Sequence, residues 1–480
     1  MTKTIKNICC IGAGYVGGPT MAVIAKNCPE ILINVVDVDK KRIEAWNNSE
    51  LSNLPVFEPG LSQIIFETRN KNLFFSTNVK QSIESADLVF ISVNTPTKTK
   101  GLASGKASDL KWVEKCARQV AEYAKGNTLV VEKSTLPVRT AEVIKKILLE
   151  SQSKLPKGGV DKTFDILSNP EFLAEGTAIN DLLKPDRVLI GGDKAEAIDA
   201  LSNIYEKWVP KKKILRTNLW SSELAKLTAN AFLAQRISAI NTISALCEKT
   251  GANVKQVSEA VGLDNRIGNR FLESGPGFGG SCFQKDILNL IYLSESLGLQ
   301  EVADFWNQVI KINNWQRKRI SKLIIDRLFG TVTGKKIGIL GFSFKANTND
   351  TRESSAIQIC KDLQEDGAFL MIHDPKVSIE SVEKCLGTTP ASPTKINSNS
   401  DLDGLWSFTN DLNQTFNNSD ALIIITEWSE YFEIDWSNVS NRMRKPSWIF
   451  DTRGIVNIEE LKRNGLKLWM VGNGEIKNKF

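Results

Sequence analysis

The sequence of 480 residues contains a single histidine, His373. Zinc hydrolases and hydrolases with a Ser-His-Asp or Cys-His arrangement depend on imidazole, so we do not expect the chain to belong to these classes. Acid and base catalysis is therefore assigned to Asp, Glu and Lys side chains. The eight cysteines include neither a C-x-x-C pair nor the spacing of a metal site. Seven of them are interpreted as structural thiols in a reducing, cytoplasmic compartment, and no metal site is predicted.

Long apolar runs and a strong net charge are missing as well. No apolar run reaches the length that crosses a bilayer, and the first residues lack the apolar segment of a signal peptide. The formal net charge of +6 is small for this length. We therefore expect neither a membrane nor a nucleic acid as a partner. The length itself exceeds one ordinary hydrophobic core and predicts two or three domains.

The N-terminal motif is a glycine turn between a predicted strand, residues 5–11, and a predicted helix that ends near residue 26. The turn consists of Gly12, Ala13, Gly14, Tyr15, Val16 and Gly17. A second strand, residues 31–36, ends at Asp37, twenty residues after Gly17. In such a unit the glycines let a pyrophosphate approach a helix N-terminus, and the acid binds the ribose diol of NAD. The context favours NAD binding over a purely structural glycine turn.

Polar side chains follow three further predicted strands, residues 87–93, 128–132 and 164–167. Ligands of an open parallel sheet bind at the carboxyl ends of its strands. The residues that become candidates for lining a pocket are Thr95, Ser134, Thr135, Glu171 and Glu175. The alternative is ordinary turn chemistry, because Asn, Pro, Ser and Thr are common in loops.

A glycine-rich segment near the middle of the chain leads into a helix that carries a thiol. The segment contains Gly275, Gly277, Gly279 and Gly280, and Ser281 follows directly. Ser281 and Gln284 have the spacing of a capping box, which predicts Cys282 at the first helical position, where a thiol ionises more easily. Asp286 lies four residues later on the same face and can handle a proton or a water. The alternative is that Cys282 is a buried, small apolar residue.

Residues 221–250 form a predicted helix of unusual length that ends at Gly251. Such a helix joins two domains or forms a subunit interface. Lys226 and Asn230 lie one turn apart on it, in apolar surroundings, and can place two donors at an oxyanion. The alternative is that both side chains lie on the exposed outer face.

A second α/β half begins after residue 333, with predicted strands over residues 336–340, 369–372, 421–426 and 447–450. Gly341 has no further glycines at the fingerprint spacing, so we expect Lys345, Arg352 and Arg453 to bind phosphates or a carboxylate there instead of a second NAD. Residues 387–418 are interpreted as a surface loop insertion. The predicted fold is α/β, with two Rossmann-like doubly wound domains, residues 1–215 and 331–480, and a central helical domain, residues 216–330.

Together these segments resemble the UDP-glucose 6-dehydrogenase family, within the nucleotide-sugar dehydrogenases that carry out four-electron oxidations. The resemblance covers nearly the whole chain. The motifs that carry it are GAGYVGGP from Gly12, NTPT from Asn94, EKSTLPVRT from Glu132, NPEFLAEGTAI from Asn169, ELAKLTANAFLAQRIS from Glu223, GPGFGGSCFQKD from Gly275, GFSFKANTNDTRES from Gly341 and DTRG from Asp451.

The resemblance implies a role for each matching residue. Cys282 becomes the nucleophile, Asp286 and Glu171 handle protons and water, Thr135 helps to place the water, and Lys226 with Asn230 stabilises oxyanions. The residues implied around NAD are Gly12, Gly14, Tyr15, Val16, Gly17, Asp37, Arg42, Thr95, Ser134, Thr135, Glu175 and Arg352. Those implied around the substrate are Glu171, Phe172, Leu173, Glu175, Lys226, Asn230, Arg266, Phe271, Phe278, Gly279, Phe344, Lys345 and Arg453.

The implied reaction oxidises C6 of UDP-glucose twice. An aldehyde has no second hydride to give until a nucleophile adds to it, so a Cys282 thiohemiacetal and then a thioester are expected, with two NADH formed per uronate. The family forms dimers and hexamers; we expect a homo-oligomer, at least a dimer, with the chain length favouring a hexamer and Arg266 reaching a neighbouring subunit.

Three alternatives remain from the sequence. The first is the same reaction on another sugar nucleotide, such as UDP-N-acetylmannosamine or GDP-mannose. The sequence does not define the pockets for the base and the sugar, although the NPEFLAEGTAI segment favours UDP-glucose. A catalytically idle NAD-binding or redox-sensing protein, with Cys282 merely oxidisable, leaves Lys226, Asn230 and Asp286 without a role. Nucleic-acid binding is suggested only by the net positive charge.

Overall fold

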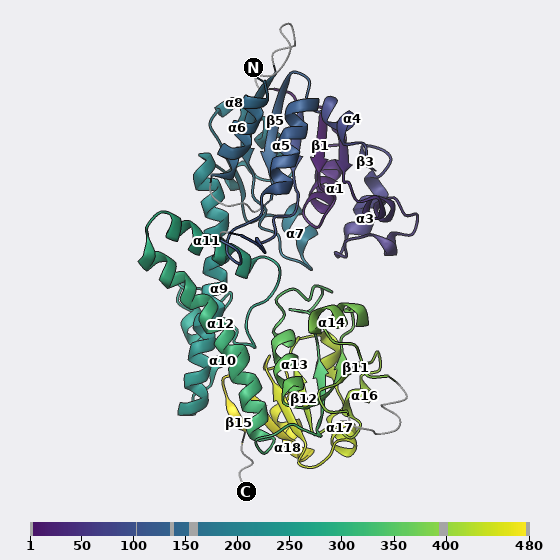
Figure 1. The fold of residues 1–480 in the computed structure, drawn as a ribbon, viewed down its shortest axis with the longest axis vertical. Coiled ribbons are helices and arrows are strands. Elements are labelled where there is room, and N and C mark those ends of the chain that lie inside the picture. The colour runs from purple at the N-terminus through teal and green to yellow at the C-terminus, as the bar shows by residue number, and fades with distance from the viewer. Residues whose placement is uncertain (1–2, 102, 135–138, 153–161, 393–401, 477–480) are drawn as a thin grey trace. The chain divides into compact units, whose positions relative to one another are not determined.

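The structure of the chain is a computed structural model that describes residues 3–101, 103–134, 139–152, 162–392 and 402–476. The chain forms two compact units (Figure 1). Unit 1 comprises Met1–Ala229 and Leu288–Ala303, and unit 2 comprises Asn230–Ile287 and Asp304–Phe480. None of the helices in these described ranges combines the length and the apolarity that a bilayer span requires.

The described part of unit 1 contains an eight-stranded sheet with the order β3-β2-β1-β4-β5-β6-β7-β8. Its strands are β1 (Asn7–Ile11), β2 (Leu32–Val36), β3 (Leu73–Ser76), β4 (Leu88–Ile91), β5 (Asn127–Glu132), β6 (Thr163–Ser168), β7 (Val188–Gly192) and β8 (Ile214–Thr217). Neighbouring strands are parallel except β6 and β7. The order of the first six strands is that of dinucleotide-binding sheets, so the predicted Rossmann-like N-terminal half is confirmed.

Both faces of this sheet are covered, which explains the apolar runs in its sequence. Along β1, Ile8 and Cys10 pack into one hydrophobic cluster, while Cys9 and Ile11 pack into another. The helices of this part of the chain are α1 (Gly17–Asn27), α2 (Lys40–Trp46), α3 (Leu61–Thr68), α4 (Val79–Glu84), α5 (Lys111–Tyr123), α6 (Thr140–Gln152), α7 (Ala178–Leu183) and α8 (Ala195–Tyr205), with short 3-10 turns η1 (Leu51–Asn53) and η2 (Lys211–Lys213).

The long central helix α9 spans Leu219–Thr250 and runs from unit 1 into unit 2. Gly251 has a φ of +81° and donates its backbone N–H to the carbonyl of Cys247 at 2.9 Å, which ends the helix. The predicted helix and its glycine cap are therefore confirmed. Three helices follow, α10 (Val254–Gly262), α11 (Phe283–Ser296) and α12 (Gln300–Arg327).

The described part of unit 2 contains a seven-stranded sheet with the order β11-β10-β9-β12-β13-β14-β15. Its strands are β9 (Lys336–Leu340), β10 (Phe369–His373), β11 (Trp406–Phe408), β12 (Ala421–Ile424), β13 (Trp448–Asp451), β14 (Lys467–Met470) and β15 (Gly474–Ile476). Its helices are α13 (Ser355–Glu365), α14 (Ile379–Leu386), α16 (Asn413–Phe416), α17 (Trp436–Arg442) and α18 (Ile458–Arg463), with η3 (Ser429–Glu433). Only β15 pairs antiparallel, and the strand order repeats that of the first sheet, so the second Rossmann-like half is confirmed too.

The interpretation of residues 387–418 as a loop insertion is wrong in part. Within this range β11 forms an edge of the second sheet, and α16 follows it. The Trp406 side chain is fully buried in the core of unit 2. A strand of three residues is too short to show an alternation of apolar and polar residues, and the surrounding sequence is rich in Ser, Thr, Asn and Pro. The apolar Trp406 was the residue that could have indicated a buried element here. Residues 393–401 lie outside the described ranges.

Candidate active site

The glycine turn between β1 and α1 is built for close packing and for an anion. Gly12 has a φ of +110°, and a Cβ at Gly17 would lie 2.0 Å from the Gly12 carbonyl oxygen. A Cβ at Gly14 would meet no atom within 4 Å. Val16 precedes α1 without a side-chain capping bond, and the Gly18 amide donates to the Gly14 carbonyl at 3.0 Å, which closes the turn onto the helix. The turn therefore places the positive end of the α1 dipole where a pyrophosphate would lie.

Asp37 lies at the end of β2, buried, with its carboxylate turned toward the glycine turn. Its Oδ2 accepts hydrogen bonds from the Ala13 amide at 2.9 Å and from Arg42 Nη1 at 3.0 Å. Its Oδ1 accepts from the Asp39 amide at 3.0 Å. The structure thus brings together the predicted turn, Asp37 and Arg42 as a site that fits a pyrophosphate and a ribose diol.

Glu171, which follows β6, lies in a cluster of positive charges within unit 1. Its Oε1 accepts the amides of Phe172 at 2.8 Å and Leu173 at 3.1 Å, and its Oε2 lies 2.8 Å from the ammonium of Lys133. Burial alone raises the pKa of Glu171, but Lys133, the Phe172 amide and Lys226 outweigh burial and hold that pKa below its ordinary value. Glu171 is therefore ionised and suited to accept a proton.

Lys226 on α9 is almost fully buried, so the alternative of an exposed outer face is wrong. Its ammonium lies 5.1 Å from the centre of the Phe172 ring, and the Arg187 guanidinium lies 3.8 Å from the same ring. Phe172 therefore carries two cations on or near its ring. At the neighbouring strand ends, Thr95 is buried and the hydroxyl of Ser134 donates to the Val93 carbonyl at 2.7 Å.

In unit 2, the amide of Asn230 donates to Asp286 Oδ2 at 2.6 Å, and both side chains are buried. Asp286 Oδ1 lies 3.1 Å from the ammonium of Lys285. Cys282 is the one exposed thiol among the eight cysteines, so the alternative of a buried apolar residue is wrong. The hydroxyl of Ser281 lies 3.4 Å from its sulfur.

The predicted helix start is displaced by one residue. α11 begins at Phe283, and the carbonyl of Cys282 accepts the first helical bond, from the Asp286 amide at 2.9 Å. Cys282 is therefore the N-cap residue, not the first helical residue predicted from a capping box at Ser281. The physical reason is that Ser281 turns its hydroxyl to the thiol. The sulfur still lies at a helix N-terminus.

The substrate residues predicted in unit 2 surround the glycine-rich segment. A Cβ at Gly279 would lie 2.8 Å from Cβ of Phe344, and Arg453 donates from Nη2 to the Phe344 carbonyl at 3.2 Å. The Phe278 ring is buried against Phe283 with ring centres 5.9 Å apart. Two further predicted residues lie here. The ring centres of Phe271 and Phe283 are 6.5 Å apart, and the ammonium of Lys345 lies 5.7 Å from the centre of the Phe344 ring.

Other predicted residues lie elsewhere or pair locally. The side chain of Arg266 is 88% exposed and forms an ion pair with Asp264, so the structure does not bring it to the glycine-rich segment of its own chain. Arg352 pairs with Asp350 through Nη2 at 2.6 Å. Glu175 is half-buried in the segment after β6. Thr135 lies outside the described residues.

Three domain models of one family match the chain. They are described as the UDP-glucose/GDP-mannose dehydrogenase family's NAD binding domain, over residues 6–209, its central domain, over residues 220–315, and its UDP binding domain, over residues 338–458. The chain belongs to the UDP-glucose/GDP-mannose dehydrogenase family. This membership makes it an oxidoreductase with NAD as its cofactor, so both predictions are confirmed.

Individual members of the family are similar over nearly the whole chain. The UDP-glucose 6-dehydrogenases of Rattus norvegicus and Drosophila melanogaster are each 53% identical, covering 98% and 97% of this chain and 93% and 96% of their own. UDP-glucose 6-dehydrogenase 3 of Oryza sativa subsp. japonica is 50% identical over 97% of this chain and 96% of its own. The structure of a UDP-glucose dehydrogenase from Pyrobaculum islandicum aligns with a TM-score of 0.80 at 30% identity, covering 96% of each chain.

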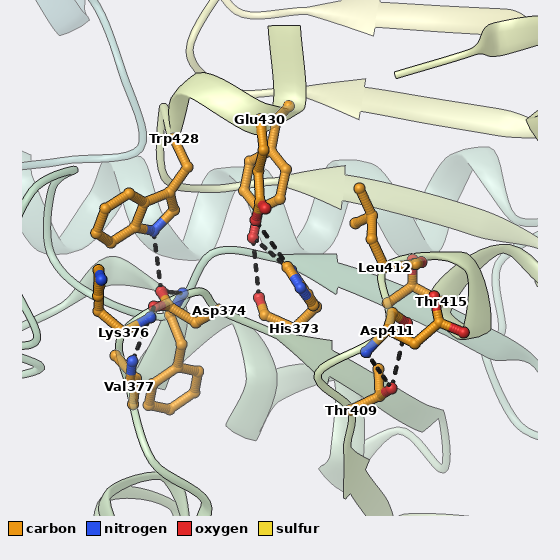
Figure 2. Close-up of polar contacts among 12 residues, drawn as sticks. His373, Asp374, Lys376, Val377, Thr409, Asp411, Leu412, Thr415, Trp428 and Glu430 are labelled. Carbon is orange, nitrogen blue, oxygen red and sulfur yellow. Dashed lines mark hydrogen bonds and ion pairs between the residues drawn. The ribbon is translucent and has the colours of Figure 1, made fainter. Parts of the chain in front are cut away.

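In unit 2, the turn after β9 repeats the turn that follows β1 in unit 1. Gly341 bonds the His373 carbonyl as Gly12 bonds that of Val36, each at 2.8 Å, so Asp374 takes the place of Asp37. Both oxygens of the Asp374 carboxylate accept hydrogen bonds. They accept from the amides of Phe342, Ser343, Lys376 and Val377, the Ser343 hydroxyl and the Trp428 indole. Figure 2 shows Lys376, Val377 and Trp428 around this carboxylate.

A set of buried side chains that was not predicted from the sequence holds the glycine-rich segment. It is here called the loop clamp and consists of Asn241, Asn313, Gln316, Arg317 and Ser355. Asn313 bonds both the amide and the carbonyl of Phe278, at 2.8 and 3.1 Å, and Arg317 Nη2 donates to the same carbonyl at 2.6 Å. Gln316 donates to the Gly275 carbonyl at 2.8 Å, and Asn241 accepts the Gly275 amide at 2.8 Å. Only contacts far apart in sequence identify these residues.

Proposed function

We propose that this chain oxidises UDP-glucose at C6 to UDP-glucuronate with two molecules of NAD. The UDP-glucose 6-dehydrogenases at 50–53% identity and the match of the UDP binding domain over residues 338–458 support this substrate. The observation that carries the proposed chemistry is the exposed Cys282 thiol at the start of α11, one helical turn before the buried Asp286–Asn230 pair.

The residues of unit 1 fit the cofactor. The glycine turn at the start of α1 would receive the pyrophosphate, and the Asp37 carboxylate would bind the ribose hydroxyls. NAD, when bound, accepts a hydride in each of the two oxidations, alcohol to aldehyde and thiohemiacetal to thioester. Thr95, Ser134, Thr135, Glu175 and Arg352 complete the proposed cofactor site.

Between the two oxidations, Cys282 makes the second hydride available. The thiolate forms a bond to the aldehyde carbon, and the carbonyl electron pair moves to oxygen, where Lys226 and Asn230 stabilise the oxyanion. The resulting carbon again carries a hydrogen that can leave as hydride. Without this addition an aldehyde would accumulate after one oxidation.

Water completes the turnover. It attacks the thioester, the C–S bond breaks, the thiolate returns to Cys282, and Asp286 and Glu171 accept the protons of the water. The balanced reaction consumes one alcohol, two NAD⁺ and one water, and gives one carboxylate, two NADH and three protons. The lowered pKa keeps Glu171 ionised, so the carboxylate is present when the proton leaves.

We also infer a homo-oligomer of at least two subunits and a cytoplasmic location. Large apolar side chains on the central helices are exposed, among them Phe232 and Leu246 on α9 and Phe305 and Trp315 on α12. A second copy that covers them supports assembly, and would carry Arg266 to a neighbouring site. Sedimentation velocity tests this, with a monomer as the contradicting result. The three functional domains are proposed as residues 1–215, 216–330 and 331–480.

The decisive experiment is a panel of UDP- and GDP-sugars with NADH counted per acid formed. UDP-glucose is expected to give two NADH per uronate. One NADH with free aldehyde contradicts the role of Cys282, and a preference for UDP-N-acetylmannosamine or GDP-mannose contradicts the substrate. The Cys282→Ala variant, expected to bind NAD without turnover, is the control for the thiol.

A further inference from the structure

Lys133 lies buried at the carboxyl end of β5, where the function described above assigns it no role. Its side chain is 3% exposed, and its ammonium contacts three polar groups of unit 1. These are Glu171 Oε2 at 2.8 Å, Asn169 Oδ1 at 3.1 Å and the Tyr205 hydroxyl at 3.4 Å. Burying an ammonium costs free energy unless the charge is paired and hydrogen-bonded. The three polar groups compensate for the burial of the Lys133 charge.

The neighbours of Lys133 are themselves held in place. The Tyr205 hydroxyl donates to Asn169 Oδ1 at 2.7 Å, and Asn169 Nδ2 donates to the Leu189 carbonyl at 2.8 Å. The orientation of Asn169 is therefore fixed, with its oxygen toward both Lys133 and Tyr205. The ammonium is left with one charged partner among these contacts, the Glu171 carboxylate.

The other oxygen of Glu171 is fixed from the opposite side by the amides of Phe172 and Leu173. A carboxylate held on one oxygen by backbone amides and on the other by an ammonium has one orientation and one charge state. Burial lowers the pKa of Lys133, but Glu171 and Tyr205 outweigh burial and raise it above the ordinary value, so the pair is ionised on both sides.

We propose that Lys133 is a positioning residue for the oxidation, which holds Glu171 as an oriented carboxylate ready to accept a proton. The inference rests on the proposed role of Glu171. The other titratable groups that face the pair are Tyr205 of α8, Lys226 of α9 and the buried thiol of Cys10 on β1. Of these groups only Lys226 also lowers the pKa of Glu171.

The test is the pH dependence of kcat in the full-length Lys133→Met variant. Activity requires ionised Glu171, so it is lost as pH falls through the pKa of that carboxyl. Without the ammonium, burial raises this pKa, and the acid limb of the profile moves to higher pH by roughly one unit or more. Lys133→Arg keeps the charge and is expected to retain the acid limb of the wild type, even at a lower kcat.

A double-mutant comparison keeps the proposal testable if Lys133→Met lowers stability. In a Glu171→Gln background, Lys133→Met is expected to change kcat less than about two-fold, because the partner through which it acts is gone. Lys213→Met, which removes a half-buried ammonium of unit 1 that donates to the Pro185 carbonyl at 2.8 Å, is the matched control and is expected to leave the profile unchanged.

Two results overturn the inference. The first is an acid limb of Lys133→Met that coincides with that of the wild type. The second is a double variant whose loss of kcat equals the product of the losses in Lys133→Met and Glu171→Gln, because the two residues would then act independently. NADH stoichiometry is measured in the same preparations. If the wild type fails to give two NADH per uronate from UDP-glucose, the proposed function fails; if it does so and the acid limb does not move, only the role of Lys133 fails.

Discussion

The side-chain amide of Asn230 donates a hydrogen bond of 2.6 Å to Oδ2 of Asp286, which is fully buried at the start of α11. The bond joins the residue proposed to stabilise an oxyanion to the residue proposed to move protons. Each of the two side chains therefore orients the other. Cys282 lies one turn before Asp286, and its carbonyl accepts the Asp286 amide at 2.9 Å, so the pair and the thiol belong to the same helix start.

Replacing Asp286 with Asn is expected to remove the negative charge of this side chain and to keep its hydrogen bond with Asn230. The substituted amide oxygen can still accept from Asn230, but the carboxylate that accepts a proton is lost, so kcat is expected to fall by about 10²–10⁴-fold. Steady-state NADH formation measures this, and mass spectrometry of the quenched enzyme is expected to show sugar accumulated on Cys282. A kcat within a few-fold of the wild type, without an adduct, would remove Asp286 from the mechanism.

Replacing Asp37 with Asn is expected to weaken NAD binding. Asp37 accepts the Ala13 amide of the glycine turn, and its carboxylate is proposed to accept hydrogen bonds from the ribose hydroxyls of NAD. The Asn variant loses the charge that strengthens these hydrogen bonds, so the Kd for NAD is expected to rise by roughly 10–100-fold. Fluorescence titration measures the affinity. The exposed Asp193, which pairs with Lys145, provides the control variant Asp193→Asn. An unchanged Kd for NAD would mean that the fingerprint has been misread.

The sequence was sufficient for the parts of this protein that are local along the chain. The apolar runs predicted the central strands because parallel strands are buried on both faces. The spaced glycines predicted the turn, and Asp37 twenty residues after Gly17 predicted the acid beside it. The short strand β11 was not predicted, because three residues are too few to show the alternation of apolar and polar side chains of a strand. Cys282 was placed one residue too far into its helix because a capping-box spacing says nothing about where the Ser281 hydroxyl turns.

The supporting contacts of the site were beyond sequence reasoning because they join distant segments. Arg317 reaches the Phe278 carbonyl across 39 residues, and Lys133 reaches Asn169 across 36 residues. Each of these lysine and arginine side chains looks like an ordinary surface charge in the sequence. Only their burial shows that they hold other groups in place.

Replacing Arg317 with Met is expected to loosen the glycine-rich segment. Arg317 donates to the carbonyls of Phe278 at 2.6 Å and Glu353 at 2.7 Å, so its loss frees the backbone beside the proposed sugar pocket. We expect kcat/KM for UDP-glucose to fall by roughly 10–100-fold while the affinity for UDP changes little. Kinetics and calorimetry measure the two quantities.

The exposed neighbour of Arg317 on α12 supplies the control, because Lys318→Met changes the same charge on the same helix. Its kinetics are expected to match the wild type. Equal losses in UDP and UDP-glucose affinity for Arg317→Met would contradict a role specific to the sugar, and a wild-type kcat/KM would show that the loop clamp does not position the segment.

Replacing Glu132 with Gln is expected to stabilise the protein at alkaline pH. Glu132 is buried, and burial together with the neighbouring Glu223 carboxyl raises its pKa well above the ordinary value of 4.5. The folded state thus keeps a proton that the unfolded state releases, so stability falls as pH rises from the ordinary value through the raised one. A neutral amide removes this dependence, and Tm at pH 8 is expected to rise by about 2–4 °C, with little change at pH 4.5.

Thermal unfolding between pH 4.5 and pH 9 measures this difference. Glu223 retains its bonds from the amides of Arg139 and Ala141, so the Glu132→Gln substitution leaves the start of α6 capped and tests the ionisation of Glu132. Glu114→Gln, on the surface of α5, serves as the control because its partner Arg118 is exposed. If the Tm of Glu132→Gln runs parallel to that of the wild type across the whole range, Glu132 is already ionised in the folded protein and the proposed cause of the pH dependence is wrong.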